Sequence, residues 1–312
     1  MTIDTTLDGF VHPALFYRSD DEYLAALVPF VSDGVAAGQP VAVAVPGPRL
    51  SVLRAALSGV ADGVTMIDMA EAGRNPGRII AGVLRRFADE HPGTHVRIIG
   101  EPIWPGRTAD EYPACAQHEA LINAAFTGRD LTIVCPYDVA GLDPHVVADA
   151  RATHPLVWEA DSRYPSDDYA PERVIAHYNQ PLDGRADAVA MTVTEVNQIT
   201  AARRFTTAHA RALGLAEERV ADLELIATEL VTNSLIHATG SCVLRLWRHG
   251  DHLVCEVRDA GHLSDPLAGR RPAPGDQPFG RGLLLVNELA DLVRAHTTPT
   301  GTTLRALLRL AR

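Results

Sequence analysis

Three side chains that could do chemistry together follow one another at intervals of four residues: Glu229, Asn233 and His237. They interrupt an apolar run that is typical of a helix, and a spacing of four places them on one helix face. A carboxylate beside a carboxamide suits a magnesium-bound nucleotide, because Mg²⁺ prefers oxygen ligands and a nearby carboxylate can hold or deprotonate a nucleophile. By itself such a pair more often marks a solvated helix face.

An acid and a glycine close the next apolar run. Residues 253–257 read as a strand that forms a hairpin with 243–247 around Gly250. Asp259 and Gly261 follow at the end of this strand. An acid there could accept a hydrogen bond from the amino group of adenine.

Glycines open a further helix after a loop rich in proline and glycine, which spans 262–279. In Gly280-Arg281-Gly282 the free N–H groups and the positive end of the following helix favour phosphate. Loops of this length and composition often act as lids. A last apolar strand, 304–310, comes directly after Thr302 and Thr303.

This ordered set resembles the GHKL ATPase superfamily, which includes gyrases and histidine kinases, and most closely its anti-sigma-factor serine kinases. The resemblance covers 189–312 and implies a GHKL (Bergerat) α/β sandwich that binds ATP with Mg²⁺. It implies that Glu229 is the catalytic base, that Asn233 is the Mg²⁺ ligand and that Asp259 binds adenine. The further nucleotide-contact residues that the resemblance implies are His237, Gly261, Gly280, Arg281, Gly282, Thr302 and Thr303.

The sequence departs from this family at one position and leaves two alternatives open. The usual second glycine after Asp259 is replaced, since the chain reads Gly261-His262-Leu263. This change keeps open a non-catalytic module in which ATP only stabilises a partner-binding surface. A sensor histidine kinase is the other alternative, with His118 as the phosphoacceptor. The predicted strand that follows at 131–135 interrupts the helix hairpin which such a kinase needs.

Composition narrows the class of protein. The chain has 312 residues, 46% of them hydrophobic, with a mean hydropathy of zero, enough for two packed cores. There is no lysine, which excludes a Walker A lysine. The net charge of −11 disfavours direct binding of nucleic acid. Neither a membrane helix nor a signal peptide is predicted, so we expect a cytoplasmic protein. The four cysteines, Cys115, Cys135, Cys242 and Cys255, are expected to be buried free thiols.

In the first half, apolar runs alternate with amphipathic helices. This pattern predicts a mostly parallel sheet with helices on both faces. The expected strands are 14–17, 41–45, 64–67, 96–99 and 131–135. Ligands of such sheets collect at the carboxyl ends of the strands. Five residues there or on the intervening helix are candidates for a sensory pocket, although they could equally be packing and solvated residues: Glu101, Trp104, Glu119, Tyr137 and Asp138.

This half resembles the MEDS sensory domain, a RecA-like or KaiC-like module found in front of bacterial regulators. The resemblance rests on four segments, which are His12 to Tyr23, 34–46, Cys135 to Asp138 and His154-Pro155. It implies that the domain senses a small ligand or a partner. His12 and His154 could be functional, but a lone histidine beside proline is more often structural.

Together these patterns predict two α/β domains, a sensory domain at 1–165 and an ATP-binding kinase domain at 188–312, joined by a linker at 166–187. The family resemblance implies that the chain binds a sigma factor or its anti-sigma antagonist and phosphorylates a serine of the antagonist. A small molecule would act on the sensory domain, and a homodimer is left open. The sequence does not identify the sigma factor or the signal.

Overall fold

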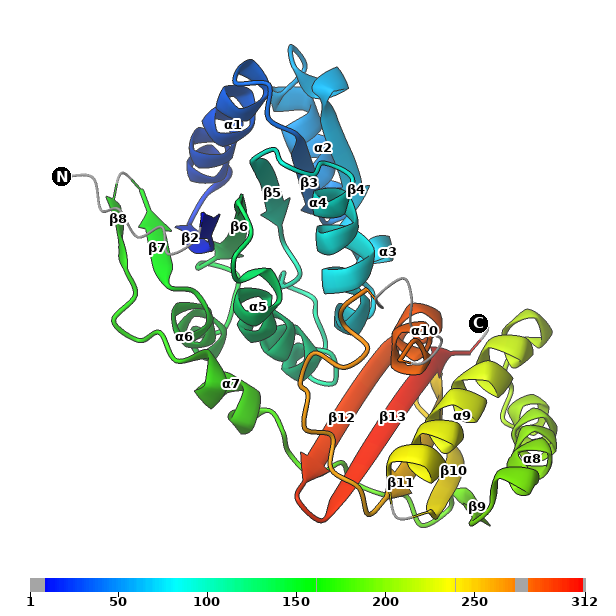
Figure 1. Cartoon of the computed structure of the whole chain (residues 1–312). Coiled ribbons are helices and arrows are strands. Elements are labelled where there is room, and N and C mark those ends of the chain that lie inside the picture. Colours follow the sequence, from blue (N-terminus) through cyan, green and yellow to red (C-terminus); the bar gives the residue numbers. More distant parts are fainter. Residues whose placement is uncertain (1–8, 161, 239, 273–279, 311–312) are drawn as a thin grey trace. The chain divides into compact units, whose positions relative to one another are not determined.

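The computed structural model describes residues 9–160, 162–238, 240–272 and 280–310. They form two compact units, 1–178 and 179–312. Figure 1 shows that each unit has a β-sheet with helices packed against it. The expected α/β architecture, with one mostly parallel sheet and one sandwich of sheet and helices, is confirmed.

The first unit is built on an eight-stranded sheet with the order β4-β3-β5-β6-β2-β7-β8, and β1 pairs with β6. Within the described residues β7 and β8 pair antiparallel and the other neighbours pair parallel. All five expected strands are present. The strands are β1 (Phe10–Val11), β2 (Pro13–Tyr17), β3 (Val41–Val45), β4 (Val64–Asp68), β5 (Val96–Gly100), β6 (Leu131–Asp138), β7 (Leu156–Glu159) and β8 (Ser162–Pro165).

Helices cover both faces of this sheet because its strands are apolar on both sides. On one face Tyr23 and Leu27 pack into a core with Val43 of β3 and Val134 of β6. The neighbouring residue Cys135 points to the opposite face, since side chains alternate along a strand. The helices are α1 (Asp20–Ala36), α2 (Gly47–Ala56), α3 (Met69–Ala72), α4 (Arg86–Asp89), α5 (Tyr112–Phe126), α6 (Pro144–Thr153) and α7 (Pro171–His177), with short helices η1 (Ala61–Gly63), η2 (Pro76–Arg78) and η3 (Ile80–Arg85).

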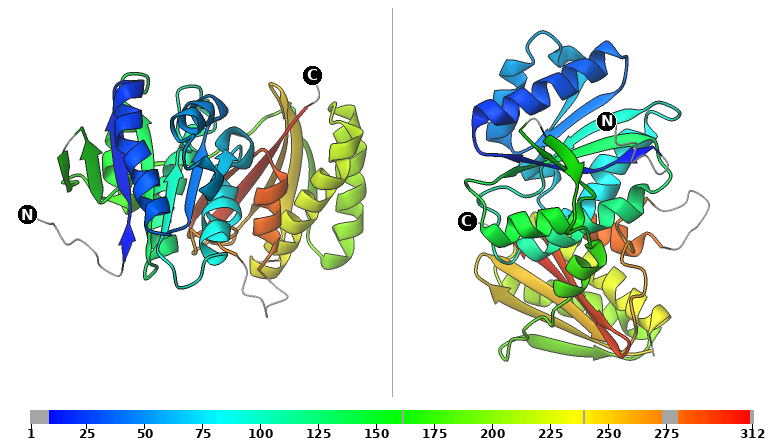
Figure 2. Two further views of the ribbon diagram at one scale, coloured as in Figure 1. Left: turned by 90° about the horizontal axis from the view of Figure 1, so that it is seen from above. Right: turned by 90° about the vertical axis from the view of Figure 1, so that its left-hand side faces the viewer.

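The second unit is a five-stranded antiparallel sheet with the order β12-β13-β11-β10-β9. Figure 2 shows α8 and α9, in yellow-green and yellow, along one side of the orange and red strands. The strands are β9 (Val189–Val193), β10 (Cys242–His249), β11 (His252–Asp259), β12 (Leu292–Thr298) and β13 (Gly301–Arg309). The helices are η4 (Val196–Gln198), α8 (Ile199–Ala212), α9 (Glu217–His237) and α10 (Gly282–Leu289).

Three smaller features bear on the sequence predictions. The four cysteines are buried and form no disulfide within the described residues, as expected. Among the described residues, no helix combines the length and the apolar character needed to cross a bilayer. Helix α7 packs against α5 and lies in the first unit. The linker boundaries at 166–187 stay a prediction.

Candidate functional site

Helix α9 positions Glu229, Asn233 and His237, which follow one another at intervals of four residues. The helix begins at Glu217 with acids in its first turn, where they suit the helix dipole. Its apolar stripe, which includes Leu223 and Leu230, packs into the core of the sheet. Glu229 and Asn233 consequently lie at the half-buried edge of the helix, and His237 is exposed in its last turn.

The start of α10 comes very close to this edge of α9. A Cβ atom at Gly282 would lie 2.5 Å from Glu229 Oε2 and 3.2 Å from Asn233 Nδ2. The contact therefore requires a residue without a side chain at position 282. Gly280, two residues earlier, has a φ of +95°, a left-handed conformation that glycine adopts without steric cost. In the predicted phosphate motif, Gly280 thus permits a left-handed backbone conformation and Gly282 permits the close approach to α9.

Asp259 lies at the end of β11 and is held by two donors. Ser234 Oγ donates to Asp259 Oδ2 at 2.5 Å, and the Gly261 N–H donates to Asp259 Oδ1 at 2.8 Å. A Cβ at Gly261 would lie 2.8 Å from Ala238 Cβ, so this glycine also permits a close approach. A carboxylate keeps further lone pairs when two are used, and Asp259 can still accept a bond from a ligand.

Thr302 fixes the segment that leaves β11. Its hydroxyl donates to the Gly261 carbonyl at 2.9 Å and accepts from the Leu263 N–H at 3.2 Å. Thr297 Oγ1 accepts from the same N–H at 3.0 Å. Thr303 is buried but belongs to the opposite face of the sheet, because Thr302 and Leu304 line the pocket and side chains alternate along β13.

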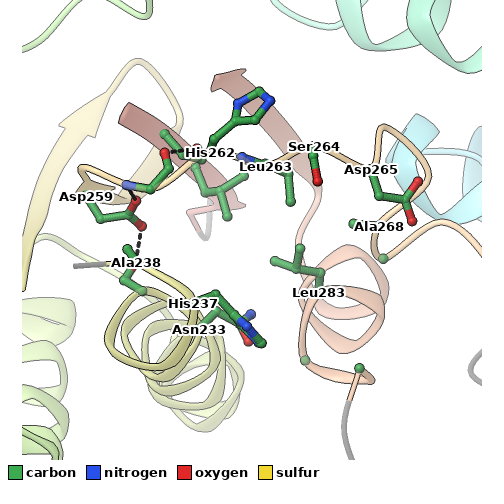
Figure 3. A pocket seen from close by; sticks show the side chains of 17 residues that line it. Asn233, His237, Ala238, Asp259, His262, Leu263, Ser264, Asp265, Ala268 and Leu283 are labelled. Atoms are coloured by element: carbon green, nitrogen blue, oxygen red, sulfur yellow. Dashed lines mark hydrogen bonds between the residues drawn. The ribbon is translucent and has the colours of Figure 1, made fainter. Parts of the chain in front are cut away.

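These elements enclose a pocket of about 510 Å³. Figure 3 shows Asn233 and His237 of α9 opposite Leu283 of α10, with Asp259 and Leu263 along another side. The predicted nucleotide-contact residues that line the pocket are Asn233, His237, Asp259, Gly261, Gly280, Gly282 and Thr302. Glu229, Arg281 and Thr303 do not line it, although Glu229 comes within the distance of Gly282 given above.

The described part of the loop after β11 is tied to its surroundings. Asn287 Nδ2 donates to the Gly269 carbonyl at 2.9 Å, and a Cβ at Gly269 would lie 2.5 Å from Leu283 Cβ. This part of the loop therefore packs directly on α10. The predicted lid extends over 273–279, which lie outside the described residues.

The sequence analysis missed Ser234 as part of this site. The residue is only 4% exposed and occupies the apolar stripe of α9, four residues after Leu230. The signal in the sequence that could have indicated Ser234 was a lone hydroxyl within such a stripe. It marks a buried polar contact, here with Asp259.

The five candidate sensory residues fall into three local groups in the first unit. Glu101 is 2% exposed and accepts a hydrogen bond from Tyr23 Oη at 3.2 Å. Burial raises the pKa of Glu101 to about 8, against the opposing effects of Arg49 and Tyr23. The Arg49 guanidinium lies 4.9 Å from the Tyr23 ring centre and 3.9 Å from Asp138 Oδ2. Arg49, which the sequence analysis did not single out, thus contacts both Asp138 and Tyr23, the residue that donates to Glu101.

The other three candidates lie elsewhere in this unit. Trp104 stacks under the Arg107 guanidinium, 3.9 Å from its ring centre. Glu119 is 1% exposed and faces the imidazoles of His12 and His154. Tyr137 packs edge-on against the His154 ring, with 5.6 Å between the ring centres. A single pocket that contains all five residues stays a prediction.

Comparison with known protein families matches each half of the chain to a known domain. Residues 11–155 match the MEDS family, described as the methanogen/methylotroph, DcmR sensory domain. Residues 192–308 match the histidine kinase-like ATPase domain. No curated protein matches the chain significantly.

Several solved structures are similar to parts of this chain. The SiaB-SiaC complex from Pseudomonas aeruginosa is similar at 14% identity over 38% of this chain and 88% of that chain, with a TM-score of 0.32. The RsbU and RsbW domains of Rv1364c from Mycobacterium tuberculosis are similar at 23% identity over 41% and 34%, with a TM-score of 0.30. The chain thus spans about a third of the second protein. The Acinetobacter baumannii histidine kinase AdeS is similar at 10% identity over 46% and 81%, with a TM-score of 0.24.

Proposed function

We propose that this chain, which joins a MEDS sensory domain to a histidine kinase-like ATPase domain, is a cytoplasmic bacterial signalling switch. It binds Mg-ATP in the pocket of its second unit and phosphorylates a serine of an anti-sigma antagonist. The sensory domain controls this activity. The observation that carries the proposal is the approach of Gly282 to Glu229 and Asn233, at a pocket whose other side holds Asp259.

The residues of the pocket fit a magnesium-bound nucleotide. Asn233 offers an amide oxygen, which is a suitable ligand for a hard cation, and Mg²⁺ held there would neutralise phosphate charge. Gly280 and Gly282 leave space at the start of α10, where backbone N–H groups favour phosphate. Asp259 is fixed by Ser234 and Gly261 as an acceptor for an amino group.

Glu229 has the position and the freedom of a general base. Among the described residues its carboxylate has no hydrogen-bond or ion-pair partner, and it lies next to the backbone at Gly282. It can accept the proton of a serine hydroxyl that approaches the phosphate side of the pocket. Phosphoryl transfer depends mainly on positioning and on charge stabilisation, so one such base with the glycine-rich turn is a sufficient set of groups.

The partner is assigned from the motif resemblance to anti-sigma-factor serine kinases. The net charge of −11 is unfavourable for nucleic acid, which supports a protein partner. A sigma factor or its antagonist would then bind the kinase domain, and a small-molecule signal would bind the sensory domain.

A non-catalytic binding module is the second candidate. Leu263 occupies the position of the missing glycine, and its N–H is bonded to the hydroxyls of both Thr297 and Thr302. A segment fixed in this way favours a rigid pocket over a hinged one. ATP would then only stabilise the partner-binding surface.

The position of His118 does not support the alternative of a sensor histidine kinase. His118 is 0% exposed on α5, whereas a phosphoacceptor must reach a nucleotide. The element after α5 is the strand β6, not the second helix of a hairpin.

Calorimetry of the full chain with Mg-ATP tests the nucleotide site. We expect Asn233→Ala to weaken Mg-dependent binding, and Asp259→Asn to weaken adenine selectivity, each by about tenfold or more because a hydrogen bond to a charged or metal-bound group is lost. Asn197→Ala and Asp251→Asn, which alter exposed residues outside the pocket, are the matched controls. Equal affinity of all five proteins would rule out the assignment.

A further inference from the structure

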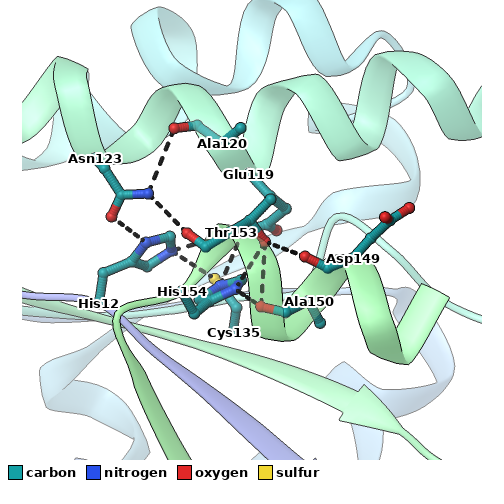
Figure 4. A network of polar contacts seen from close by, with 9 residues as sticks. All are labelled: His12, Glu119, Ala120, Asn123, Cys135, Asp149, Ala150, Thr153 and His154. Atoms are coloured by element: carbon teal, nitrogen blue, oxygen red, sulfur yellow. Dashed lines mark hydrogen bonds and ion pairs between the residues drawn. The ribbon is translucent and has the colours of Figure 1, made fainter. Parts of the chain in front are cut away.

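Four side chains with metal-binding atoms converge inside the first unit. His12 precedes β2, Glu119 lies on α5, Cys135 on β6, and His154 follows α6. Their potential ligand atoms all lie within 4.8 Å of one another, and the side chains are between 0% and 1% exposed. Figure 4 shows the two imidazoles and the carboxylate pointing toward one centre beside the sulfur.

Hydrogen bonds outside this cluster place a proton on Nδ1 of both imidazoles. His154 Nδ1 lies 2.8 Å from the Ala150 carbonyl, which only accepts, so Nδ1 carries the proton. Asn123 Nδ2 donates to the Thr153 carbonyl at 2.7 Å, which turns its Oδ1 toward His12 Nδ1 at 3.0 Å. In its neutral form each imidazole therefore presents the lone pair of Nε2 to the centre.

The cluster consequently contains more acceptors than donors. Neither oxygen of Glu119 has a hydrogen-bond partner within the described residues. The Cys135 thiol is the one group at the centre that brings a proton in these tautomers, and its sulfur lies 3.4 Å from His12 Nε2. A buried carboxylate without donors is costly, and a cation at the centre would compensate it.

Three of the separations between the potential ligand atoms fit a tetrahedral ion. His154 Nε2 lies 3.2 Å and His12 Nε2 3.6 Å from Glu119 Oε2. For a tetrahedral zinc site with bonds of 2.0 to 2.3 Å, two ligand atoms are about 3.3 to 3.8 Å apart. The separations of 3.2, 3.4 and 3.6 Å agree with these values within a few tenths of an ångström, and the other pairs lie within 4.8 Å.

We propose that His12, Glu119, Cys135 and His154 form a transition-metal site, with Zn²⁺ as the ion that suits it best. Two imidazoles and a thiolate favour zinc over Mg²⁺ or Ca²⁺, which take oxygen ligands. On binding, the Cys135 thiol loses its proton to solvent and the sulfur forms a bond to the metal. One divalent ion with one thiolate and one carboxylate is neutral in sum, which limits the cost of burying these charges.

The site would be structural, because protein atoms supply all four ligands of the tetrahedron. The contacts of Asn123 and Ala150 to the two imidazoles are the outer hydrogen bonds that orient metal-bound histidines. The ion would tie the chain before β2 to the end of α6, far apart in sequence. This inference is independent of the ATP site in the second unit.

Metal content and Co²⁺ spectroscopy of the full chain provide the test. After removal of metal with a chelator, we expect one equivalent of Zn²⁺ to bind and to raise the melting temperature. Co²⁺ should give tetrahedral absorption with a thiolate charge-transfer band, which Zn²⁺ then displaces. Cys135→Ser should abolish that band and His154→Gln should weaken binding about 100-fold or more. Cys115→Ser, a change at a buried cysteine outside the cluster, should retain both.

Two results would overturn the site. The first is a wild-type chain that binds no Zn²⁺ and melts at the same temperature with metal and with chelator. The second is a charge-transfer band that survives in Cys135→Ser or disappears in Cys115→Ser. If Cys135→Ser fails to fold, the wild-type melting shift and the His154→Gln titration still decide between the outcomes.

Discussion

Ser234 Oγ donates a hydrogen bond of 2.5 Å to Asp259 Oδ2, which links the middle of α9 to the end of β11. The bond orients the carboxylate that is proposed to bind adenine. Because Ser234 is only 4% exposed, water does not easily replace it. The helix that carries Glu229 and Asn233 therefore also sets the position of the adenine acceptor.

Replacement of this hydroxyl should weaken both stability and nucleotide binding. In Ser234→Ala, one oxygen of Asp259 loses its donor, at a cost of about 1 to 3 kcal/mol in the free energy of unfolding. We expect ATP affinity to fall several-fold, because the carboxylate is no longer fixed. Ser51→Ala, at an exposed hydroxyl on α2, is the control. Unchanged ATP affinity in Ser234→Ala would show that the bond has no part in the site.

A methyl group at position 282 should impair phosphoryl transfer without unfolding the chain. In Gly282→Ala the new Cβ meets Glu229 Oε2, the end of a flexible side chain, so the carboxylate moves and the helices need not. We expect transfer to fall at least about tenfold, and stability to change by less than about 1 kcal/mol, since alanine is the better helix former. Gly59→Ala, where the added atom meets open space, is the matched control. Normal transfer by Gly282→Ala would contradict a catalytic role for this contact.

The stability of the first unit should depend on the ionisation of Glu101. Its pKa of about 8 in the folded chain is above the ordinary value of 4.5, because burial disfavours the charged form. The folded chain thus holds an extra proton between these values, and this group's contribution to stability falls as the pH rises through that range. Glu101→Gln cannot ionise and avoids the loss.

We therefore expect Glu101→Gln to gain stability relative to wild type between pH 5 and pH 8, by about 1 kcal/mol or more at the upper end. Thermal unfolding of the full chain at several pH values measures this difference. Glu90→Gln, at an exposed position directly after α4, should show a flat difference over the same range. A flat difference for Glu101→Gln as well would mean that Glu101 is already ionised in the folded chain.

Local sequence patterns predicted the elements that carry the nucleotide motifs. The helix expected around Glu229, Asn233 and His237 is α9, and the expected hairpin lies within β10 and β11. These elements have strong periodicity and clear ends, which is why the sequence defines them. Strand β12 was missed because it is an edge strand with Arg294 and His296 on one side, so it lacks a continuous apolar run.

Contacts between distant segments could not be predicted in the same way. Strand β2 lies between β6 and β7, and this order brings His12 next to Cys135 and His154. No local pattern encodes the order of strands in a sheet. For the same reason the sequence marked Glu119 as a candidate but did not predict that His12 and His154 lie beside it.

The most direct measurement is transfer of the ATP γ-phosphoryl group to candidate antagonist proteins by wild type and by Glu229→Gln. Glutamine keeps the size of the side chain but cannot accept the hydroxyl proton, a contribution of about 10²- to 10⁴-fold in rate. We predict that ATP affinity stays within a few-fold while transfer collapses, and that Glu218→Gln, at an exposed residue of the same helix, transfers normally. Full transfer by Glu229→Gln would reject the proposed base. A wild type that binds ATP and partner but never phosphorylates it would contradict the kinase and favour the binding module.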